Sequence, residues 1–472
     1  MKEENPQENQ VRVPHFPPVQ GGTPPNARYQ KVPFLPIKKE STHLNLTVEG
    51  EIPPQLDGLY VRNGPNHIDE IHPHHHYFSS HGMVHGVRIS DKKALWYRNR
   101  MVKSGNVPEL LGQPDIGGPI SHEFDASPNT NVAAFGDKLY ATIEAGPNMV
   151  ELDPYLESVS RSDLQGALTF GFTGHHKVDP VNHDIHGVVY SMVLRGQAQY
   201  VRLTPDGKLL NEVKVPLTGA TQIHDMSITE HYIIIYDLNV VFDPVLLSQT
   251  TLPIRWKGDK PGRVGVLPKD GTSADIRWFE VTPCYVYHAM NAYEAPNGDV
   301  VIDVSRYERA AEKDLYGPLG DTLPTIDRWT LPMNGNTARA KEERIVDLAL
   351  DFPKISPQVE GRAYRYGYSV QATLNPSFEG AVKIDHQTGK VEHQDFNGGK
   401  ASELTFVPRE GATDEDDGWL MGFVFDPEKE RSRLVILNGQ DFAGEPAASI
   451  WIPDNHVPIG THGGWFPGFG GR

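Results

Sequence analysis

Four histidines lie far apart in this chain, each within a short apolar or glycine-rich stretch: His175, His224, His288 and His462. The intervals between them are 49, 64 and 174 residues, which are too long for a zinc finger or a single-helix metal motif. Neutral imidazole is the commonest metal ligand in proteins, and four around one ion would suit iron, copper, nickel or zinc. These residues can form a metal centre only if the fold returns the chain repeatedly to one point.

Short apolar runs of the strand type alternate with turn signals along most of the sequence, as in HYIIIYDLNVVF and RLVILNGQDF. The segments TPDGKLL, DHQTGKVE and APNGDVVI predict hairpin turns in which glycine supplies a positive φ. Only TARAKEERIVDLAL and DPYLESVSRSDLQG are predicted to be helical, as connections rather than core. The pattern is typical of an all-β protein.

The spacing of these runs favours a β-propeller. A body of roughly 430 residues made of evenly spaced short strands fits six to eight blades of about 40–60 residues each. The innermost strands of a propeller surround a central axis, so one histidine from each of four blades would meet there. A pair of β-sandwiches would bring the four together only by coincidence.

Composition limits the partners and the organisation of the chain. A net charge of -17 argues against nucleic acid as a partner, and no apolar run approaches the ~20 residues that span a bilayer. The single cysteine, Cys284, excludes an intrachain disulfide and is consistent with a cytoplasmic protein. We expect residues 1–36 to be a proline-rich, partly disordered arm and residues 37–472 to be one propeller domain.

A series of longer segments between Val48 and Pro467 resembles the carotenoid cleavage oxygenases, which include retinoid isomerohydrolases and stilbene-cleaving dioxygenases. The segments occur in the order of that family and are GEIPPQLDGLYVRNGPN, HGMVHGVRI, NTNVAAFGDKLYATIEAG, TGHHKVDP, IHDMSITEHY, HAMNAYE, DFPKISP, SELTFVPREGATDEDDGWL, SRLVILNGQDF and THGGWFP. The resemblance implies a seven-bladed propeller with non-haem Fe(II) on its axis and short helical or loop elements over one face. It also implies O₂ as co-substrate.

The resemblance assigns roles to named positions. His175, His224, His288 and His462 match the iron ligands, with His176 in place of the proline that usually follows the first. Glu144, Glu403 and Asp351 match the carboxylates that hold the ligand imidazoles. Thr130 matches a residue that shields one coordination position. Asp351 stands where the family commonly has glutamate, so its hydrogen bond to a ligand is in question.

Two departures from the family lie next to each other in the sequence. FSSHGM (78–83) replaces the common FDGDGM, which removes two acidic residues and alters the entrance or a structural turn. The preceding run, His72 to His76, is expected to be a solvated loop, with binding of adventitious metal as the alternative. His81 matches no ligand and is expected to be structural.

The implied function is oxidative cleavage of a conjugated carbon–carbon double bond by O₂, giving two carbonyl products. Stilbene-cleaving relatives have a lysine immediately before the first supporting glutamate, whereas this chain has Ile143. An apolar polyene, a carotenoid or apocarotenoid, is therefore favoured over a phenylpropanoid. A substrate of this kind also makes transient peripheral membrane contact plausible. The alternatives are a stilbene-cleaving dioxygenase, a propeller that carries an apolar ligand without cleaving it, and a calcium-dependent propeller hydrolase, which would need oxygen ligands at the axis.

Overall fold

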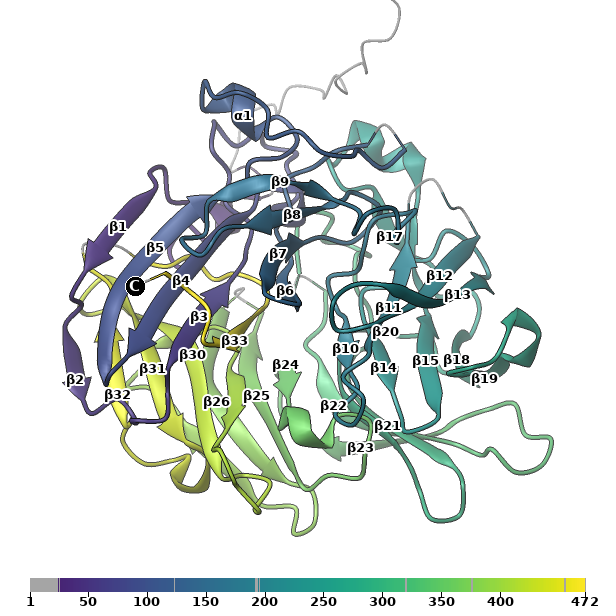
Figure 1. The fold of residues 1–472 in the computed structure, drawn as a ribbon. Helices are drawn as coiled ribbons and strands as arrows, with labels where there is room; N and C mark the ends of the chain where they lie inside the picture. Colours follow the sequence, from purple (N-terminus) through teal and green to yellow (C-terminus); the bar gives the residue numbers. More distant parts are fainter. Residues whose placement is uncertain are drawn as a thin grey trace, which may run out of the picture.

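The computed structural model describes residue 24 and residues 26–471, apart from 123, 192–193, 195, 319–320, 375–376 and 454–455. Its strands form seven blades around a central axis (Figure 1), as the sequence predicts. Neighbouring innermost strands contact one another around that axis, for example β33 with β6 and β14 with β20. The ten-stranded sheet comprises two blades joined through β28 (Lys400–Ala401), which pairs with one strand of each blade.

The strands of each blade are given from the innermost outward. The first blade has β33 (Gly463–Pro467), β3 (Gly58–Arg62), β4 (Met83–Ser90), β5 (Lys93–Met101) and β1 (Ser41–Leu44). The second has β6 (Asn131–Phe135), β7 (Lys138–Thr142), β8 (Met149–Leu152) and β9 (Ser158–Ser162), and the third has β10 (Lys177–Val178), β11 (Ile185–Tyr190), β12 (Gln197–Leu203) and β13 (Leu209–Pro216). The fourth has β14 (Met226–Ile228), β15 (Tyr232–Asp237), β18 (Gly262–Pro268) and β19 (Arg277–Val281).

The fifth blade has β20 (Tyr285–Glu294), β21 (Val300–Tyr307), β22 (Thr325–Leu331) and β23 (Lys341–Val346). The sixth has β24 (Leu350–Lys354), β25 (Tyr366–Thr373), β26 (Ser377–Asp385) and β27 (Val391–Gln394). The seventh has β29 (Thr405–Pro408), β30 (Gly418–Asp426), β31 (Arg431–Asn438), β32 (Ala448–Trp451) and β2 (Val48–Gly50). A separate hairpin joins β16 (Val240–Phe242) to β17 (Ile254–Trp256). The short helices are η1 (Ala27–Gln30), η2 (Tyr77–Ser79), α1 (Val107–Leu110), η3 (Pro244–Ser248), η4 (Ser273–Asp275), η5 (Pro357–Val359) and η6 (Gly439–Asp441).

The ring is closed by strands from both ends of the chain. The C-terminal strand β33 pairs with β3, in the register Gly58 to Pro467, and β2 pairs with β32. Two blades thus combine N- and C-terminal segments. Such closure removes the open edge at which a circular array of sheets would otherwise separate.

The sequence of each strand reflects its place between neighbouring blades. In β15, Ile233, Ile234 and Ile235 are all fully buried, because both faces of a mid-blade strand are covered. Each of the three predicted hairpin turns is present, with a glycine at positive φ in every one (Gly207, Gly298 and Gly389). The glycine turns in the sequence therefore correctly predict these three pairs of neighbouring strands.

The two helical predictions are wrong. TARAKEERIVDLAL contains β23, and DPYLESVSRSDLQG contains β9. Each is the last strand of its blade, paired on one side only, with β22 and β8 respectively. Charged residues are common on such edge strands, and strand pairing overrides the helix propensity of lysine and glutamate.

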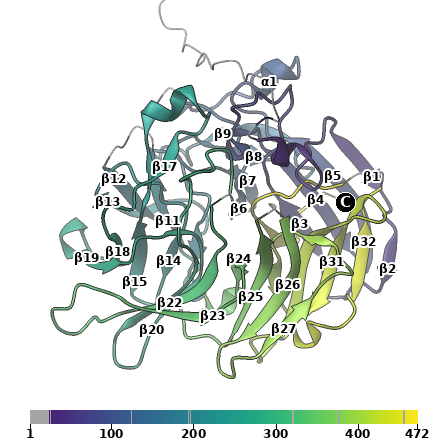
Figure 2. The ribbon, with the colours of Figure 1, turned by 180° about the vertical axis from the view of Figure 1, so that it is seen from behind.

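Some of the short helical and loop elements gather over one side of the propeller, with α1 at the top of Figures 1 and 2. The predicted arm of residues 1–36 falls mostly outside the described residues. Its last part packs on the body: Tyr29 and Phe34 are buried, and the Tyr29 ring stacks on Tyr77 at 5.2 Å. In the described part of the chain, no helix combines the length and apolar character needed to cross a membrane.

Candidate metal centre

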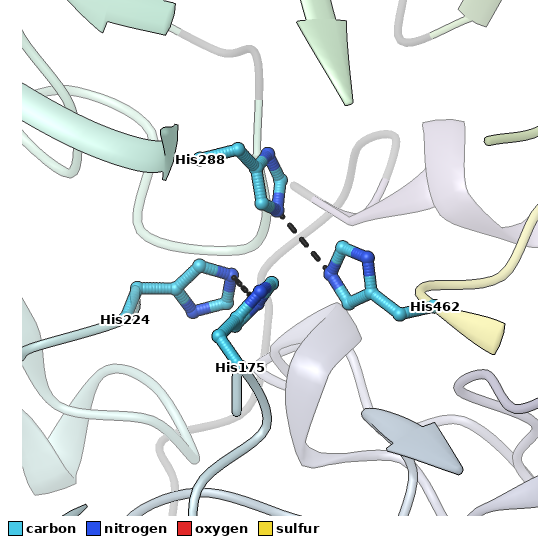
Figure 3. Close-up of side chains that lie close together, drawn as sticks. All are labelled: His175, His224, His288 and His462. Atoms are coloured by element: carbon cyan, nitrogen blue, oxygen red, sulfur yellow. Dashed lines mark hydrogen bonds between the residues drawn. The ribbon is translucent and has the colours of Figure 1, made fainter. Parts of the chain in front are cut away.

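The four histidines that lie far apart in the sequence meet at the propeller axis. His175, His224 and His462 lie one or two residues before β10, β14 and β33, and His288 lies within β20. These are the innermost strands of four blades. Figure 3 shows the four side chains pointing toward one another.

The nitrogens of this cluster are spaced as ligands around one ion. One ring nitrogen from each histidine lies within 4.8 Å of the others, and all four residues are buried. The Nε2 atoms of His175 and His224 are 3.1 Å apart, and those of His288 and His462 are 3.3 Å apart. Two ring nitrogens at such a distance are stable only with a proton or a cation between them, so the arrangement suits a metal.

Carboxylates hold the outer nitrogens of three of these rings. The Nδ1 atom of His288 lies 2.7 Å from Asp351 Oδ1, that of His462 lies 2.8 Å from Glu403 Oε1, and that of His224 lies 3.0 Å from Glu144 Oε1. A carboxylate only accepts, so each Nδ1 carries the hydrogen and each Nε2 presents its lone pair to the axis. The carboxylates also offset the charge of a bound cation.

Asp351 therefore reaches the ring of His288 although its side chain is shorter than the glutamate that is common in the family. The pairing of β24 with β25 shifts register between Asp351 and Lys354, and Phe352 has φ +49°. Bulges of this kind re-aim side chains next to functional sites. The hydroxyl of Tyr307 and the amide of Phe352 also donate to the Asp351 carboxylate.

The ionisation of the Glu403–His462 pair favours metal binding. Burial would raise the pKa of Glu403, but the charge of Lys354 and the hydrogen bond from His462 outweigh it and lower that pKa to about 2. Burial lowers the pKa of His462 to about 4, although Glu403 opposes the shift. At neutral pH the pair is thus a carboxylate and a neutral imidazole, the form that binds metals.

His175 is held differently from the other three. Its Nδ1 is 3.8 Å from Asp225, a carboxylate that also pairs with Lys177 at 3.1 Å. The backbone amide of His175 donates to the hydroxyl of Thr173 at 3.1 Å. The neighbouring His176 ring lies beside Phe172, so of the two adjacent histidines it is His175 that the structure brings into the cluster.

The remaining innermost strands supply the other predicted residues. Asp351 lies in β24, Glu403 precedes β29 and Thr130 precedes β6, whereas Glu144 follows β7. All seven innermost strands thus present one of the predicted residues near the start of the strand. This common placement explains how positions far apart in sequence reach one site.

A cleft of about 990 Å³ leads to the histidine cluster. Phe78, Thr130, Ile143 and Glu144 line it together with His224. A much smaller cavity, which His224, His288 and His462 line, has aromatic walls that include Tyr77 and Phe352.

Several contributing residues were missed at the sequence level. Lys354, which lies 2.9 Å from Glu403, and Tyr307, which donates to Asp351, gave no signal of their own, because each partner is more than 40 residues away. The expectation of a solvated histidine loop is also wrong in part. His75 and His76 are buried, since residues 72–76 fold against the rim of the cleft.

Comparison with known proteins gives consistent matches over almost the whole chain. The family described as "Retinal pigment epithelial membrane protein" matches residues 34–467. A carotenoid cleavage oxygenase of Mycobacterium tuberculosis is 34% identical over 92% of this chain and 96% of its own length. An apocarotenoid-15,15'-oxygenase of Synechocystis is 31% identical over 89% and 92%, respectively.

Solved structures give the same result for the fold. The cobalt-substituted apocarotenoid oxygenase of Synechocystis has a TM-score of 0.81 and 28% identity, covering 92% of this chain and 97% of that one. A lignostilbene dioxygenase of Pseudomonas brassicacearum has a TM-score of 0.83 at 24% identity, covering 93% and 98%. The latter likeness concerns the fold alone.

Proposed function

The chain belongs to the carotenoid cleavage oxygenases, the family matched above, and we propose that it is a non-haem iron(II) dioxygenase. The reaction would cleave a conjugated carbon–carbon double bond of a carotenoid or apocarotenoid with O₂, each carbon of the bond receiving one oxygen atom. The observation that carries the proposal is the buried set of four histidines whose ring nitrogens lie within 4.8 Å of one another, at the end of a partly apolar cleft.

The donor set fits ferrous iron, which His175, His224, His288 and His462 would hold. Four neutral imidazoles suit a first-row transition metal, and Glu144, Asp351 and Glu403 keep three of them oriented. When bound, the iron would supply the activation of O₂ that cleavage of the double bond requires. The protein contributes position, because the register of the polyene decides which bond is cleaved.

Thr130 would restrict access to one side of the centre. It lines the cleft, and its backbone carbonyl accepts a hydrogen bond from the amide of His462 at 2.9 Å. A Cβ at Gly174 would lie 2.4 Å from the Thr130 methyl, so the absence of a side chain there lets this methyl pack against Gly174, the residue before His175. We propose that the Thr130 methyl shields one coordination position and leaves another for O₂.

The lining of the cleft supports an apolar polyene. Phe78, Ile143 and Phe124 provide apolar surface, and burial of such surface is worth about 25 cal/mol per Å². Ile143 precedes Glu144 and offers no cation to a phenol. Asp115 and Arg161, farther along the cleft, add polar surface that suits a substrate with one oxygenated end.

The rim of the cleft supports transient contact with a membrane surface, from which a lipid-soluble substrate would be taken. Leu110, Ile120 and Phe124 are exposed, and the last two line the cleft. Exposed apolar groups at a cleft mouth are typical of membrane or ligand contact. Vesicle flotation of the wild type against a triple serine variant at these positions tests this part of the proposal.

The experiment that tests the function compares two chromophores. Iron-loaded protein is incubated in air with a β-apocarotenal or with resveratrol, and absorbance loss and product masses are recorded. We expect the apocarotenal to be consumed with formation of two carbonyl products, and His288→Ala to be inactive. Consumption of resveratrol alone would favour the stilbene-cleaving alternative, and binding without any product would favour a carrier.

A further inference from the structure

Residues 67–81 carry six histidines, and three of them, His67, His75 and His81, lie together on the wall of the cleft. The His67 ring centroid is 5.0 Å from that of His81 and 4.3 Å from that of His75. One ligand atom from each of His67, Asp69 and His81 lies within 4.8 Å of the others. We call these four residues the loop cluster, and they share no residue with the axial centre.

In the part of the chain that the structure describes, hydrogen bonding in the loop cluster leaves one imidazole lone pair without a partner and another only weakly engaged. The Nε2 atom of His67 is 2.8 Å from Asp69 Oδ1, and its Nδ1 is buried without a hydrogen-bond partner among the described residues. His81 Nε2 lies 3.0 Å from Asn106 Oδ1, which accepts, so Nδ1 is the unprotonated nitrogen, and its lone pair receives only a long hydrogen bond, at 3.4 Å, from the amide of Ile68. Leaving a buried polar atom unpaired is unfavourable, and a bound cation would remove that cost.

The backbone that carries these ligands is fixed by its own contacts. The Lys38 ammonium donates to the carbonyls of His67, Ile68 and Asp69 at 3.3, 3.0 and 3.0 Å. The amide of Asn66 donates to the carbonyl of His81 at 2.6 Å, which ties the two segments together. The ligands are thus positioned in advance, although the nearby Lys38 charge weakens the attraction for a cation.

Two imidazoles and a carboxylate are a donor set that zinc uses when a fourth position stays open. We propose that His67, Asp69 and His81 bind a divalent zinc-like ion, with His75 or solvent as the fourth ligand. Because His67, His75 and His81 line the same cleft as Thr130 and His224, the ion would face the space that leads to the axial centre. This proposal stands on the loop cluster alone and does not depend on the proposed reaction.

The test is a zinc titration of the full chain with its axial site loaded with iron, read by competition with a chromophoric chelator. We expect one zinc equivalent beyond the iron. Affinity should fall at least ~10-fold in His67→Gln and His81→Asn, since loss of even an outer partner of a metal ligand costs that much. His74→Gln, in the same loop but outside the loop cluster, is the matched control and should bind zinc like the wild type.

Two further variants make the outcome unambiguous. Asp69→Asn removes a ligand whose side chain is 52% exposed, so its effect on zinc does not arise from misfolding. His288→Ala should keep the zinc equivalent at the loop cluster, which separates this site from the axial one. Absence of zinc binding beyond the iron, or equal loss in His74→Gln, would overturn the proposal, the latter by showing adventitious chelation along the histidine run.

Discussion

The axial centre and the loop cluster bring histidines together in opposite ways. The axial histidines come from four blades, and carboxylates from three other elements hold three of their rings. The loop cluster is built within about 15 residues, and its one carboxylate, Asp69, is half exposed. A closed ring of blades thus makes a fully buried ligand set, whereas a loop offers a more exposed and weaker one.

The variant His288→Ala should separate the two regions most clearly. It removes one axial ligand from a bulged strand while leaving the blade hydrogen bonds intact. We expect iron content to fall from about one per chain to nearly none, since a buried site with three imidazoles has lost a quarter of its donors. Elemental analysis after desalting measures this loss, and a circular dichroism spectrum like that of the wild type shows that the fold remains. Full retention of iron would contradict the axial site.

The carboxylates behind the axial ligands should matter more than any partner in the loop cluster. Glu403→Gln and Asp351→Asn remove the charge that orients His462 and His288, with an expected loss of ~10–100-fold in iron affinity or activity. The control is Asp416→Asn, which removes a buried carboxylate paired with Lys383 away from the axis. Equal losses in all three variants would mean a general effect on stability.

Close packing at the axis predicts a paired effect that the loop should not show. In Gly174→Ala the new Cβ meets the Thr130 methyl at 2.4 Å, and we expect a cost of about 1–3 kcal/mol together with lower activity. The double variant with Thr130→Ser removes that methyl and should recover part of the stability. Melting temperatures and steady-state rates of the single and double variants measure the coupling, and strict additivity would show that the two residues do not touch.

The smallest effect is expected in the loop cluster. Without zinc, Asp69→Asn should change stability by less than about 0.5 kcal/mol, as for other exposed substitutions. With zinc at roughly 100 times its dissociation constant, the wild type should gain ~2.7 kcal/mol and the variant much less. Thermal melts with and without zinc measure the difference. The same gain in both proteins would place the zinc elsewhere.

The sequence was most informative about the strands and about the need for a fold that brings distant histidines together. Glycine hairpins and apolar runs predicted the strands, and the spacing of His175, His224, His288 and His462 required a fold that brings distant segments to one axis. It failed where pairing decides the outcome. The segment that contains β23 has the composition of a helix, yet it pairs with β22 as an edge strand.

Contacts between distant segments account for the rest. The reach of Asp351 depends on a bulge in β24, which the local sequence does not specify. The pairing of Lys354 with Glu403 and the burial of His75 likewise depend on packing between parts of the chain that are separate in sequence. In these places the residue type alone predicted a solvated side chain or an incomplete contact.

A crystal structure of the iron-loaded protein, with data collected at the iron absorption edge, tests whether the four histidines bind one ion. We expect one anomalous peak on the propeller axis, within bonding distance of one ring nitrogen of each of His175, His224, His288 and His462. A peak bound by fewer of these rings, or an iron peak only at the loop cluster, would overturn the assignment of the axial centre.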